Sequence, residues 1–166
     1  MTDFVAAEAG IRQLLARYAD AVWRKDFAAF GDCFTEDAIW KLGGREIHGR
    51  AACAKFLADV MPYFDRVLMT MGTPILEVGN GTATGRTYVT ELNARKDKRP
   101  AYSISTYYDR FVRQGDRWRL AWHHFQLHYI GPMDLSGKFF VAKDYGPPFA
   151  MPAADEPATP PESEMF

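Results

Sequence analysis

The chain has 166 residues, 48% of them hydrophobic and 14% aromatic, and a formal net charge of −1. This length predicts one domain with a sizeable buried core. The small net charge gives no electrostatic reason to expect nucleic acid or an anionic membrane as a partner. No stretch is long and apolar enough to span a bilayer, so we expect a cytoplasmic protein. Cys33 and Cys53 form no CxxC pair, which favours buried thiols in a reducing compartment over a disulfide.

The first part of the chain predicts three helices. Apolar residues recur at helical spacing over Ile11–Val22, which indicates an amphipathic helix of about twenty residues. Asp26 suits the N-cap of a short second helix. A short strand over Ala38–Leu42 and a turn at Gly43-Gly44 precede a third predicted helix over Arg50–Tyr63.

The pattern then changes to period two, which is typical of β-strands. Loops rich in turn-forming residues separate the alternating stretches, and this arrangement predicts antiparallel hairpins. The predicted strands are Val67–Glu77, Thr82–Asn93, Ala101–Arg113 and Arg117–Ile130. Three helices followed by a long, curved antiparallel sheet predict an α+β cone in which the helices close one face of the sheet.

Beyond Gly131 the regular pattern stops. Six prolines between Pro147 and Pro161 exclude a helix or a central strand there. We therefore divide the chain into a domain over residues 1–135 and a Pro-rich C-terminal arm over residues 136–166. We expect the aromatic part of the arm to pack on this subunit or on a partner, as a lid on the cavity. The end of the arm, beyond about Ala153, is expected to be disordered.

These elements, in this order, resemble the nuclear transport factor 2-like superfamily, and its SnoaL-like branch in particular. The residues that carry the resemblance are Ile11–Phe34, Thr35–Trp40, Glu46–Arg50, Tyr107–Phe111 and Gly115–Leu120. The resemblance implies a cone-shaped fold around one pocket. The superfamily includes dehydratases, a dehydrochlorinase, steroid isomerases, polyketide cyclases and proteins without a catalytic role, so the fold by itself does not select a function.

Scytalone dehydratase and hexachlorocyclohexane dehydrochlorinase are the members with the most similar catalytic pattern. They pair an aspartate late in the first helix with a histidine on the first long strand, and this dyad removes a proton. Alignment on Trp40 and on Met71-Gly72-Thr73 places Trp23 where the aspartate would stand and Thr70 where the histidine would stand. Because both dyad positions differ, the pocket either uses other groups or carries out no chemistry.

The last predicted strand carries three of the chain's four histidines, His123, His124 and His128. Strand side chains alternate between faces, so either His123 or the pair His124 and His128 points into the fold. The Tyr-x-Asp pattern of the superfamily implies that Tyr107 looks inward, and the same register turns His123 inward. We assign His123 as general base or acid, because imidazole exchanges protons near neutral pH. A strand bulge would exchange it for His124.

Tyr18, Tyr107 and Glu91 complete the set of candidate catalytic residues. Helical spacing turns Tyr18 toward the sheet, where its phenol either reaches the cavity or belongs to the core. Tyr107 shares a strand face with Ser105. This face either offers hydroxyl donors to a substrate or is an ordinary polar face. Glu91 either orients a histidine or an arginine across the sheet or lies on the surface.

The candidate substrate contacts are mostly aromatic or apolar. Tryptophans suit the walls of a pocket that stacks on a flat ring. The candidate contacts are Trp23, Trp40, Thr70, Tyr88, Ser105, Phe125 and Leu127. No histidine, cysteine or carboxylate cluster has metal-ligand spacing, and no glycine-rich phosphate loop follows a strand, so we expect neither a metal nor another cofactor.

The sequence favours a cofactor-independent lyase that acts by acid–base chemistry on a hydrophobic, hydroxylated aromatic small molecule. With a 4-hydroxyaryl substrate, loss of a benzylic hydroxyl would give a quinone methide. This intermediate could lose a proton, as in a dehydratase, or release formaldehyde by carbon–carbon cleavage. An isomerase or cyclase with a buried carboxylate base, and a non-catalytic binding protein, are the alternatives. We expect a homodimer or homotrimer, with Trp118, Leu120 and Trp122 at the centre of an apolar contact on the outer sheet face.

Overall fold

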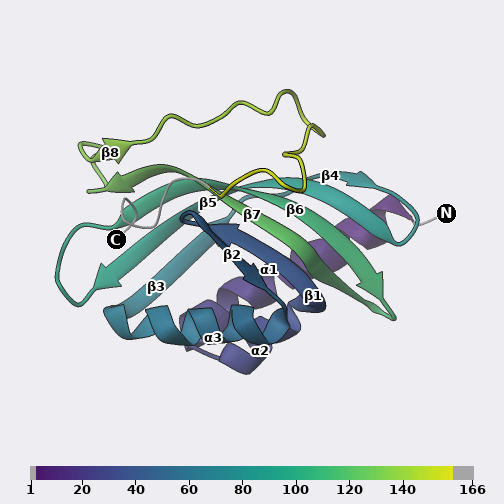
Figure 1. Cartoon of the computed structure of the whole chain (residues 1–166), viewed down its shortest axis with the longest axis horizontal. Helices are drawn as coiled ribbons and strands as arrows, with labels where there is room; N and C mark the ends of the chain where they lie inside the picture. Colours follow the sequence, from purple (N-terminus) through teal and green to yellow (C-terminus); the bar gives the residue numbers. More distant parts are fainter. Residues whose placement is uncertain (1–2, 159–166) are drawn as a thin grey trace.

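The structure is a computed structural model that describes residues 3–158. Three helices pack against one face of a curved sheet (Figure 1). The helices are α1 (Phe4–Arg24), α2 (Phe27–Asp32) and α3 (Arg50–Val60), and the 3₁₀ turn η1 (Met61–Tyr63) follows α3. The strands are β1 (Phe34–Leu42), β2 (Arg45–His48), β3 (Phe64–Met71), β4 (Ile75–Val78), β5 (Thr82–Arg95), β6 (Tyr102–Gln114), β7 (Arg117–Gly131) and β8 (Lys138–Phe139).

The helix boundaries follow from local chemistry. The Asp26 carboxylate accepts a hydrogen bond from the Ala29 N–H at 3.0 Å, as an N-cap does, which confirms the predicted start of α2. Lys25 ends α1 in the left-handed conformation, with φ of 56°. Along α1 the buried residues include Ile11, Leu14 and Tyr18, so the predicted apolar face is the face packed on the sheet.

The sheet is mixed rather than purely antiparallel. Its described strands run in the order β2-β1-β7-β6-β5-β3, with β4 paired to β5 and β8 to β7. The β1–β7 pair is parallel, so the prediction of an antiparallel sheet is wrong there. No hairpin links these two strands, and a sequence pattern that reveals hairpins does not reveal a pairing between distant segments. The α+β cone itself is confirmed.

The predicted strand over Val67–Glu77 is two strands. β3 ends at Met71 and β4 begins at Ile75. Between them lies the segment 72–74, which ends in Pro74, and proline has no N–H to give to a neighbouring strand. The chain bends at this point, so β4 pairs with the first half of β5 while β3 pairs with its second half.

Two bulges in β7 change which side chains face the helices. The β6–β7 register shifts by one residue between Leu120 and Trp122, and again between Leu127 and Tyr129. The first bulge turns Trp118 and Leu120 inward, where both belong to the hydrophobic core. Trp122 alone of the three faces outward. The apolar contact expected on the outer face is therefore wrong, and the homo-oligomer stays a prediction without this support.

The C-terminal arm crosses the outer face of the sheet, on the side opposite the helices (Figure 1). Side chains of the sheet donate hydrogen bonds to its backbone carbonyls. These bonds join Arg86 to Gly146, Arg110 to Pro152, Trp122 to Ala154 and Gln126 to Lys143. These bonds show that the arm packs on its own subunit. None of the described residues that line the pocket comes from the arm, so the arm is not the expected lid.

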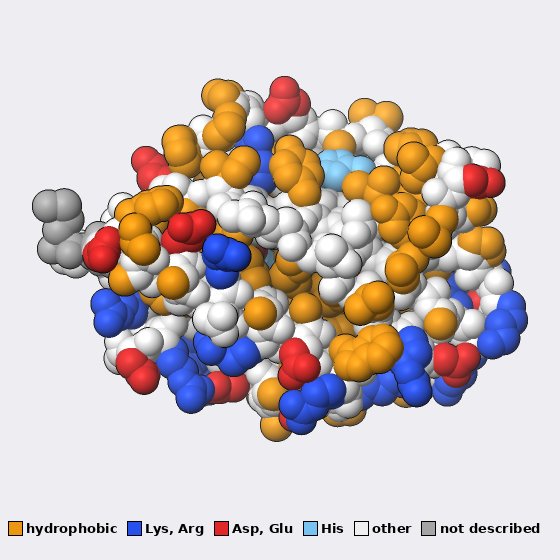
Figure 2. Space-filling view, turned by 180° about the vertical axis from the view of Figure 1, so that it is seen from behind, with side chains coloured by type: hydrophobic (Ala, Val, Ile, Leu, Met, Phe, Trp, Pro, Cys, Tyr) orange, Lys and Arg blue, Asp and Glu red, His pale blue; other side chains and the backbone are white. Residues whose placement is uncertain are grey.

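Ala154 and Glu156, in the segment that was expected to be disordered, also contact the sheet. The Lys41 ammonium, 1% exposed, donates to the Glu156 carbonyl at 2.8 Å and pairs with the Glu46 carboxylate at 2.8 Å. The rest of the segment expected to be disordered, residues 159–166, lies outside the described residues. The reverse side of the molecule shows hydrophobic side chains exposed over its upper part and Lys and Arg side chains along its lower margin (Figure 2).

Candidate active site

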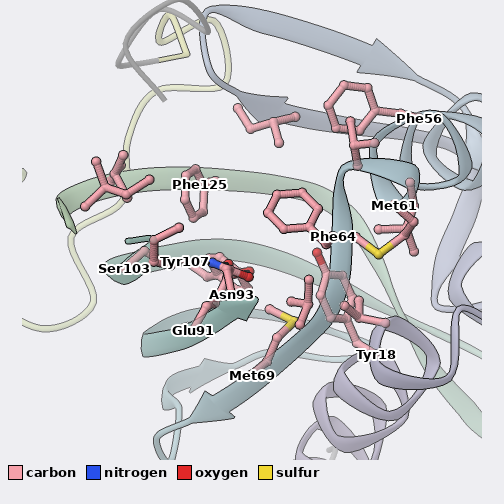
Figure 3. Close-up of a pocket in the computed structure, with 18 of the residues that line it drawn as sticks. Tyr18, Phe56, Met61, Phe64, Met69, Glu91, Asn93, Ser103, Tyr107 and Phe125 are labelled. Atoms are coloured by element: carbon pink, nitrogen blue, oxygen red, sulfur yellow. Dashed lines mark hydrogen bonds between the residues drawn. The ribbon is translucent and has the colours of Figure 1, made fainter. Parts of the chain in front are cut away.

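A pocket of about 120 Å³ lies between the helices and the concave face of the sheet. Most of its lining is apolar, and its polar groups come from α1, β5 and β6 (Figure 3). The lining residues on which the chemistry below depends are Tyr18, Trp40, Glu91, Asn93, Arg95, Ser103, Tyr107, Phe125 and Leu127. An apolar lining lowers the local dielectric constant and so strengthens the electrostatic interactions of each polar group that faces the pocket.

A chain of three buried polar side chains ends in this pocket. The Asp109 carboxylate lies 2.5 Å from Nδ1 of His123, and Nε2 of His123 lies 3.4 Å from the Tyr18 hydroxyl. Asp109 and His123 are 0% and 1% exposed. When Nδ1 of the neutral imidazole donates to Asp109, its Nε2 accepts from Tyr18. This arrangement fixes the tautomer in the way that an aspartate does in a catalytic triad.

His123 reaches the pocket through Tyr18 and does not line it. Aromatic rings surround the imidazole: the centroid of Tyr107 lies 4.4 Å away, that of Tyr18 5.6 Å and that of Trp40 5.8 Å. The predicted inward orientation of His123 is observed, and the first β7 bulge places it directly opposite Asp109 on β6. Any proton that His123 accepts from a bound molecule therefore passes through the Tyr18 hydroxyl.

A second polar group faces the same hollow from the sheet. The Tyr107 hydroxyl donates to Oε1 of Glu91 at 3.4 Å, and the Asn93 amide donates to Oε2 of Glu91 at 3.2 Å. In Figure 3 these side chains and the Tyr18 phenol point into one cavity. Glu91 thus lies in the pocket, and the surface alternative for this residue is wrong.

Burial sets the protonation of these groups. It raises the pKa of Glu91, because desolvation penalises the carboxylate more than the neutral acid, while hydrogen bonds from Asn93 and Tyr107 oppose this shift. Burial also raises the pKa of Tyr18 and Tyr107, so both phenols stay neutral donors. The pKa of Asp109 is raised by burial and is held back by His123 beside it.

Four predicted substrate contacts lie outside the pocket. Trp23 is 46% exposed and lies near the Arg66 guanidinium. Tyr18 and Val22 lie on the buried face of α1, and Trp23, the next residue, lies at the edge of that face. The other three are Thr70, Tyr88 and Ser105. Thr70 and Tyr88 are exposed on the outer sheet face. Tyr88 and Glu91 have opposite strand parity, so they cannot share one face of β5.

Ser105 is inward but too deep to line the cavity. Its hydroxyl is fully buried and lies 3.4 Å from the Val89 carbonyl, to which it donates. Ser103, two residues earlier on the same face of β6, lines the pocket instead. Of the other predicted contacts, the structure brings Trp40, Phe125 and Leu127 to the pocket wall.

The sequence interpretation missed Asp109, Asn93 and Arg95. Asp109 follows Tyr107 in the Tyr-x-Asp pattern and shares its strand face, which was the available signal. Asn93 and Arg95 follow Glu91 at intervals of two, so a register that turns Glu91 inward also turns them inward. Within residues 3–158 no three histidine, cysteine or acidic side chains are grouped to hold a metal ion, and no helix is long and apolar enough to cross a membrane.

Comparisons with known proteins agree with this fold. Residues 3–122 match the model of the SnoaL-like domain family. The structure is similar to hexachlorocyclohexane dehydrochlorinase LinA-type3 from Novosphingobium barchaimii LL02, at 19% identity and a TM-score of 0.71, over 82% of this chain and 95% of that one. It is similar to ActVI-ORFA from Streptomyces coelicolor at 22% identity and a TM-score of 0.66, over 77% and 99% of the two chains.

A protein of unknown function from Mycobacterium tuberculosis, Rv3472, is 26% identical, with a TM-score of 0.65 over 72% of this chain and 70% of that one. No curated protein sequence matches this one. The cone of three helices on a curved mixed sheet defines a protein of the nuclear transport factor 2-like class. Within that class, the chain belongs to the SnoaL-like domain family.

Proposed function

We propose that the protein is a cofactor-independent lyase that acts on a hydroxylated aromatic molecule. The observation that carries this proposal is the chain Asp109–His123–Tyr18, which ends in an apolar pocket. The family dyad is absent, since Trp23 and Thr70 occupy its positions, but another buried aspartate–histidine pair is present on β6 and β7. LinA-type3, a neighbour in fold, is named as a dehydrochlorinase, and a dehydrochlorinase also carries out an elimination.

The proposed reaction begins at the substrate phenol. As the phenol gives its proton to the Tyr18 oxygen, Tyr18 passes its own proton to Nε2 of His123, and Asp109 stabilises the imidazolium. The electron pair released on the ring expels the benzylic hydroxyl, to which Glu91 gives its proton. Water and a quinone methide result.

The quinone methide then has two possible fates. In the first, the Glu91 carboxylate takes a proton from the adjacent carbon, which restores the phenol and leaves an alkene and so completes a dehydration. In the second, a neighbouring hydroxymethyl group gives its hydroxyl proton to the Glu91 carboxylate, the carbon–carbon bond breaks, and formaldehyde leaves while the electron pair returns to the ring. In both courses His123 then returns its proton through Tyr18 to the substrate oxygen, which restores the base.

Glu91 favours an isomerase or cyclase as the second candidate. Such an enzyme moves a proton next to a ketone and needs a carboxylate base in the pocket, and Glu91 meets this requirement while Asp20, 60% exposed, does not. The two roles of Glu91 have opposite pH dependence. As a lyase acid it works protonated, so turnover falls as pH rises through its raised pKa; as an isomerase base it works ionised, so turnover rises.

The test is turnover of 4-hydroxyaryl propane-1,3-diols without added cofactor, followed by mass spectrometry for loss of water or formaldehyde. The matched substrate carries 4-methoxy in place of 4-hydroxy and cannot form the quinone methide, so it should stay unchanged. Tyr18→Phe should lower turnover about 100-fold because the proton relay is broken. Tyr145→Phe, a phenol on the outer face, is the control and should have no effect. Equal turnover of the methoxy compound would contradict the mechanism.

A further inference from the structure

We propose that the pocket takes aromatic substrates that carry a carboxylate, and that Arg95 at the pocket mouth binds this group. The inference rests on the proposed function, because it places the hydroxyaryl end of the substrate beside Tyr18 and Glu91. It goes beyond that function by naming the chemistry of the other end of the molecule.

The polar groups of β5 form a line from the reacting end to the mouth. Glu91, Asn93 and Arg95 alternate along the strand and all line the pocket. Four residues of strand span about 13 Å, so Glu91 and Arg95 stand one extended substrate length apart. The line runs from a carboxyl group through an amide to a cation, and this order matches a substrate with different chemistry at its two ends.

Arg95 has donors to spare. Its Nε and one terminal nitrogen donate to the Asp97 carboxylate at 3.0 and 2.8 Å. The guanidinium carbon lies 5.6 Å from the Phe64 ring centroid, so an aromatic ring borders the group. A guanidinium has five N–H donors, and Asp97 uses one edge of the fork. The side chain is 9% exposed, which removes most of the competition from water for the donors that remain.

The loop after Arg95 adds positive charge beside the pocket. Residues 95–99 carry four cationic side chains and one carboxylate, that of Asp97. Arg95 and Ala101, which flank this loop, both line the pocket, so the loop lies beside it. Asp97 is shared with Arg99, whose Nε lies 2.9 Å from it. The net positive field favours entry of an anionic molecule.

The size of the cavity explains why a charge at the mouth would matter. A cavity of about 150 Å³ accommodates one benzene ring, and this pocket encloses about 120 Å³. One ring therefore fills the enclosed part, between Tyr18, Trp40 and Phe125. The remainder of a larger substrate extends toward Arg95, where an ionised group meets a fixed cation.

The experiment compares two probes that have the same ring and length and differ in charge, 4-hydroxycinnamate and 4-hydroxycinnamamide. Calorimetry on the full chain should show the acid binding about tenfold more tightly than the amide, with the difference shrinking as salt is added. Arg95→Met keeps the stem against Phe64, removes the charge and should abolish the preference. Arg99→Met is the matched control, because Arg99 also pairs with Asp97 but is 62% exposed and does not line the pocket.

Asp97→Asn gives a second reading, because it removes the carboxylate that competes for Arg95 and should enlarge the preference for the acid. Equal binding of the two probes to the native protein, or failure of both to bind, overturns the inference. Equal losses in Arg95→Met and Arg99→Met also overturn it, since they would indicate a general effect of the loop charge. Preference for the acid without turnover of any carboxylated hydroxyaryl carbinol contradicts only the proposed function. Turnover of neutral substrates with no preference for the acid contradicts only the role of Arg95.

Discussion

Two neighbouring histidines on β7 have almost the same burial and opposite surroundings. His123 faces the helices, is 1% exposed and contacts Asp109 and Tyr18. His124 faces the arm, is 0% exposed, and neither of its ring nitrogens has a hydrogen-bond partner. Burial alone therefore does not distinguish the two histidines. A carboxylate on one nitrogen and a proton-carrying group on the other give His123 a direction for proton transfer.

The surroundings of His124 are those of a packed ring. It stacks on Trp122, with ring centroids 5.4 Å apart and planes 15° apart, and Tyr145 of the arm meets it edge-on at 6.2 Å. Burial, with Lys41 nearby, lowers the pKa of His124 to about 4. Its ring is thus neutral at ordinary pH and holds the arm against the sheet by contact area rather than by charge.

The largest expected effect comes from exchanging each histidine for asparagine. His123→Asn removes the proton acceptor behind Tyr18 and should lower turnover about 1,000-fold, because general acid–base catalysis is worth about 10²- to 10⁴-fold. His124→Asn should change turnover less than threefold. Steady-state rates on a 4-hydroxyaryl carbinol, with circular dichroism to establish equal folding, provide the measurement. Similar losses in the two variants would remove His123 from the proposed chemistry.

A smaller effect is expected at the acid. Glu91→Gln keeps the shape and the contact with Tyr107 but has no proton to give, so turnover should fall about 100-fold. The native enzyme should also lose turnover as pH rises through the raised pKa of Glu91, and the variant should lack this loss. Asp20→Asn, an exposed carboxylate on α1, is the control. A native rate that rises with pH in this range would favour the isomerase instead.

The pairing of His123 with Asp109 shows where a sequence stops being informative. The turn at Gly115-Asp116 joins Gln114 to Arg117, and a regular hairpin extended from that pair would set Asp109 opposite Trp122. The bulge after Leu120 adds one residue to β7 and moves His123 into that place. Alternation left His123 and His124 as alternatives, and the resemblance of the Tyr-x-Asp pattern selected His123. Neither signal locates the bulge that sets His123 opposite Asp109.

The outer face was misjudged for a similar reason. Trp118, Leu120 and Trp122 have equal parity in the sequence, so they were assigned to one surface. The same bulge separates them, and the arm then covers Trp122. Helices α1 to α3 and the hairpins were predictable because their signals lie within a few residues. The parallel β1–β7 pair and the path of the arm depend on contacts between segments far apart in the chain.

The smallest expected effect concerns stability and uses His124 alone. Its pKa is about 4 in the folded protein and near the ordinary 6.5 when unfolded, so between these values the unfolded chain binds more protons. The contribution of His124 to the free energy of unfolding is therefore fully present above pH 6.5 and is lost as pH falls. The loss is about 2 kcal/mol between pH 7.5 and pH 5.

His124→Phe should remove that loss while keeping the stack between Trp122 and Tyr145, and it leaves no unpaired ring nitrogen under the arm. Urea unfolding of the native protein and the variant at pH 7.5 and pH 5 measures the difference. The variant should be the more stable of the two at pH 5, while His48→Phe, a change at an exposed histidine, should leave the native pH dependence intact. If the native protein loses no more stability between pH 7.5 and pH 5 than His124→Phe does, burial of the neutral His124 ring does not set the pH dependence of stability. The two histidines would then differ only in their hydrogen-bond partners.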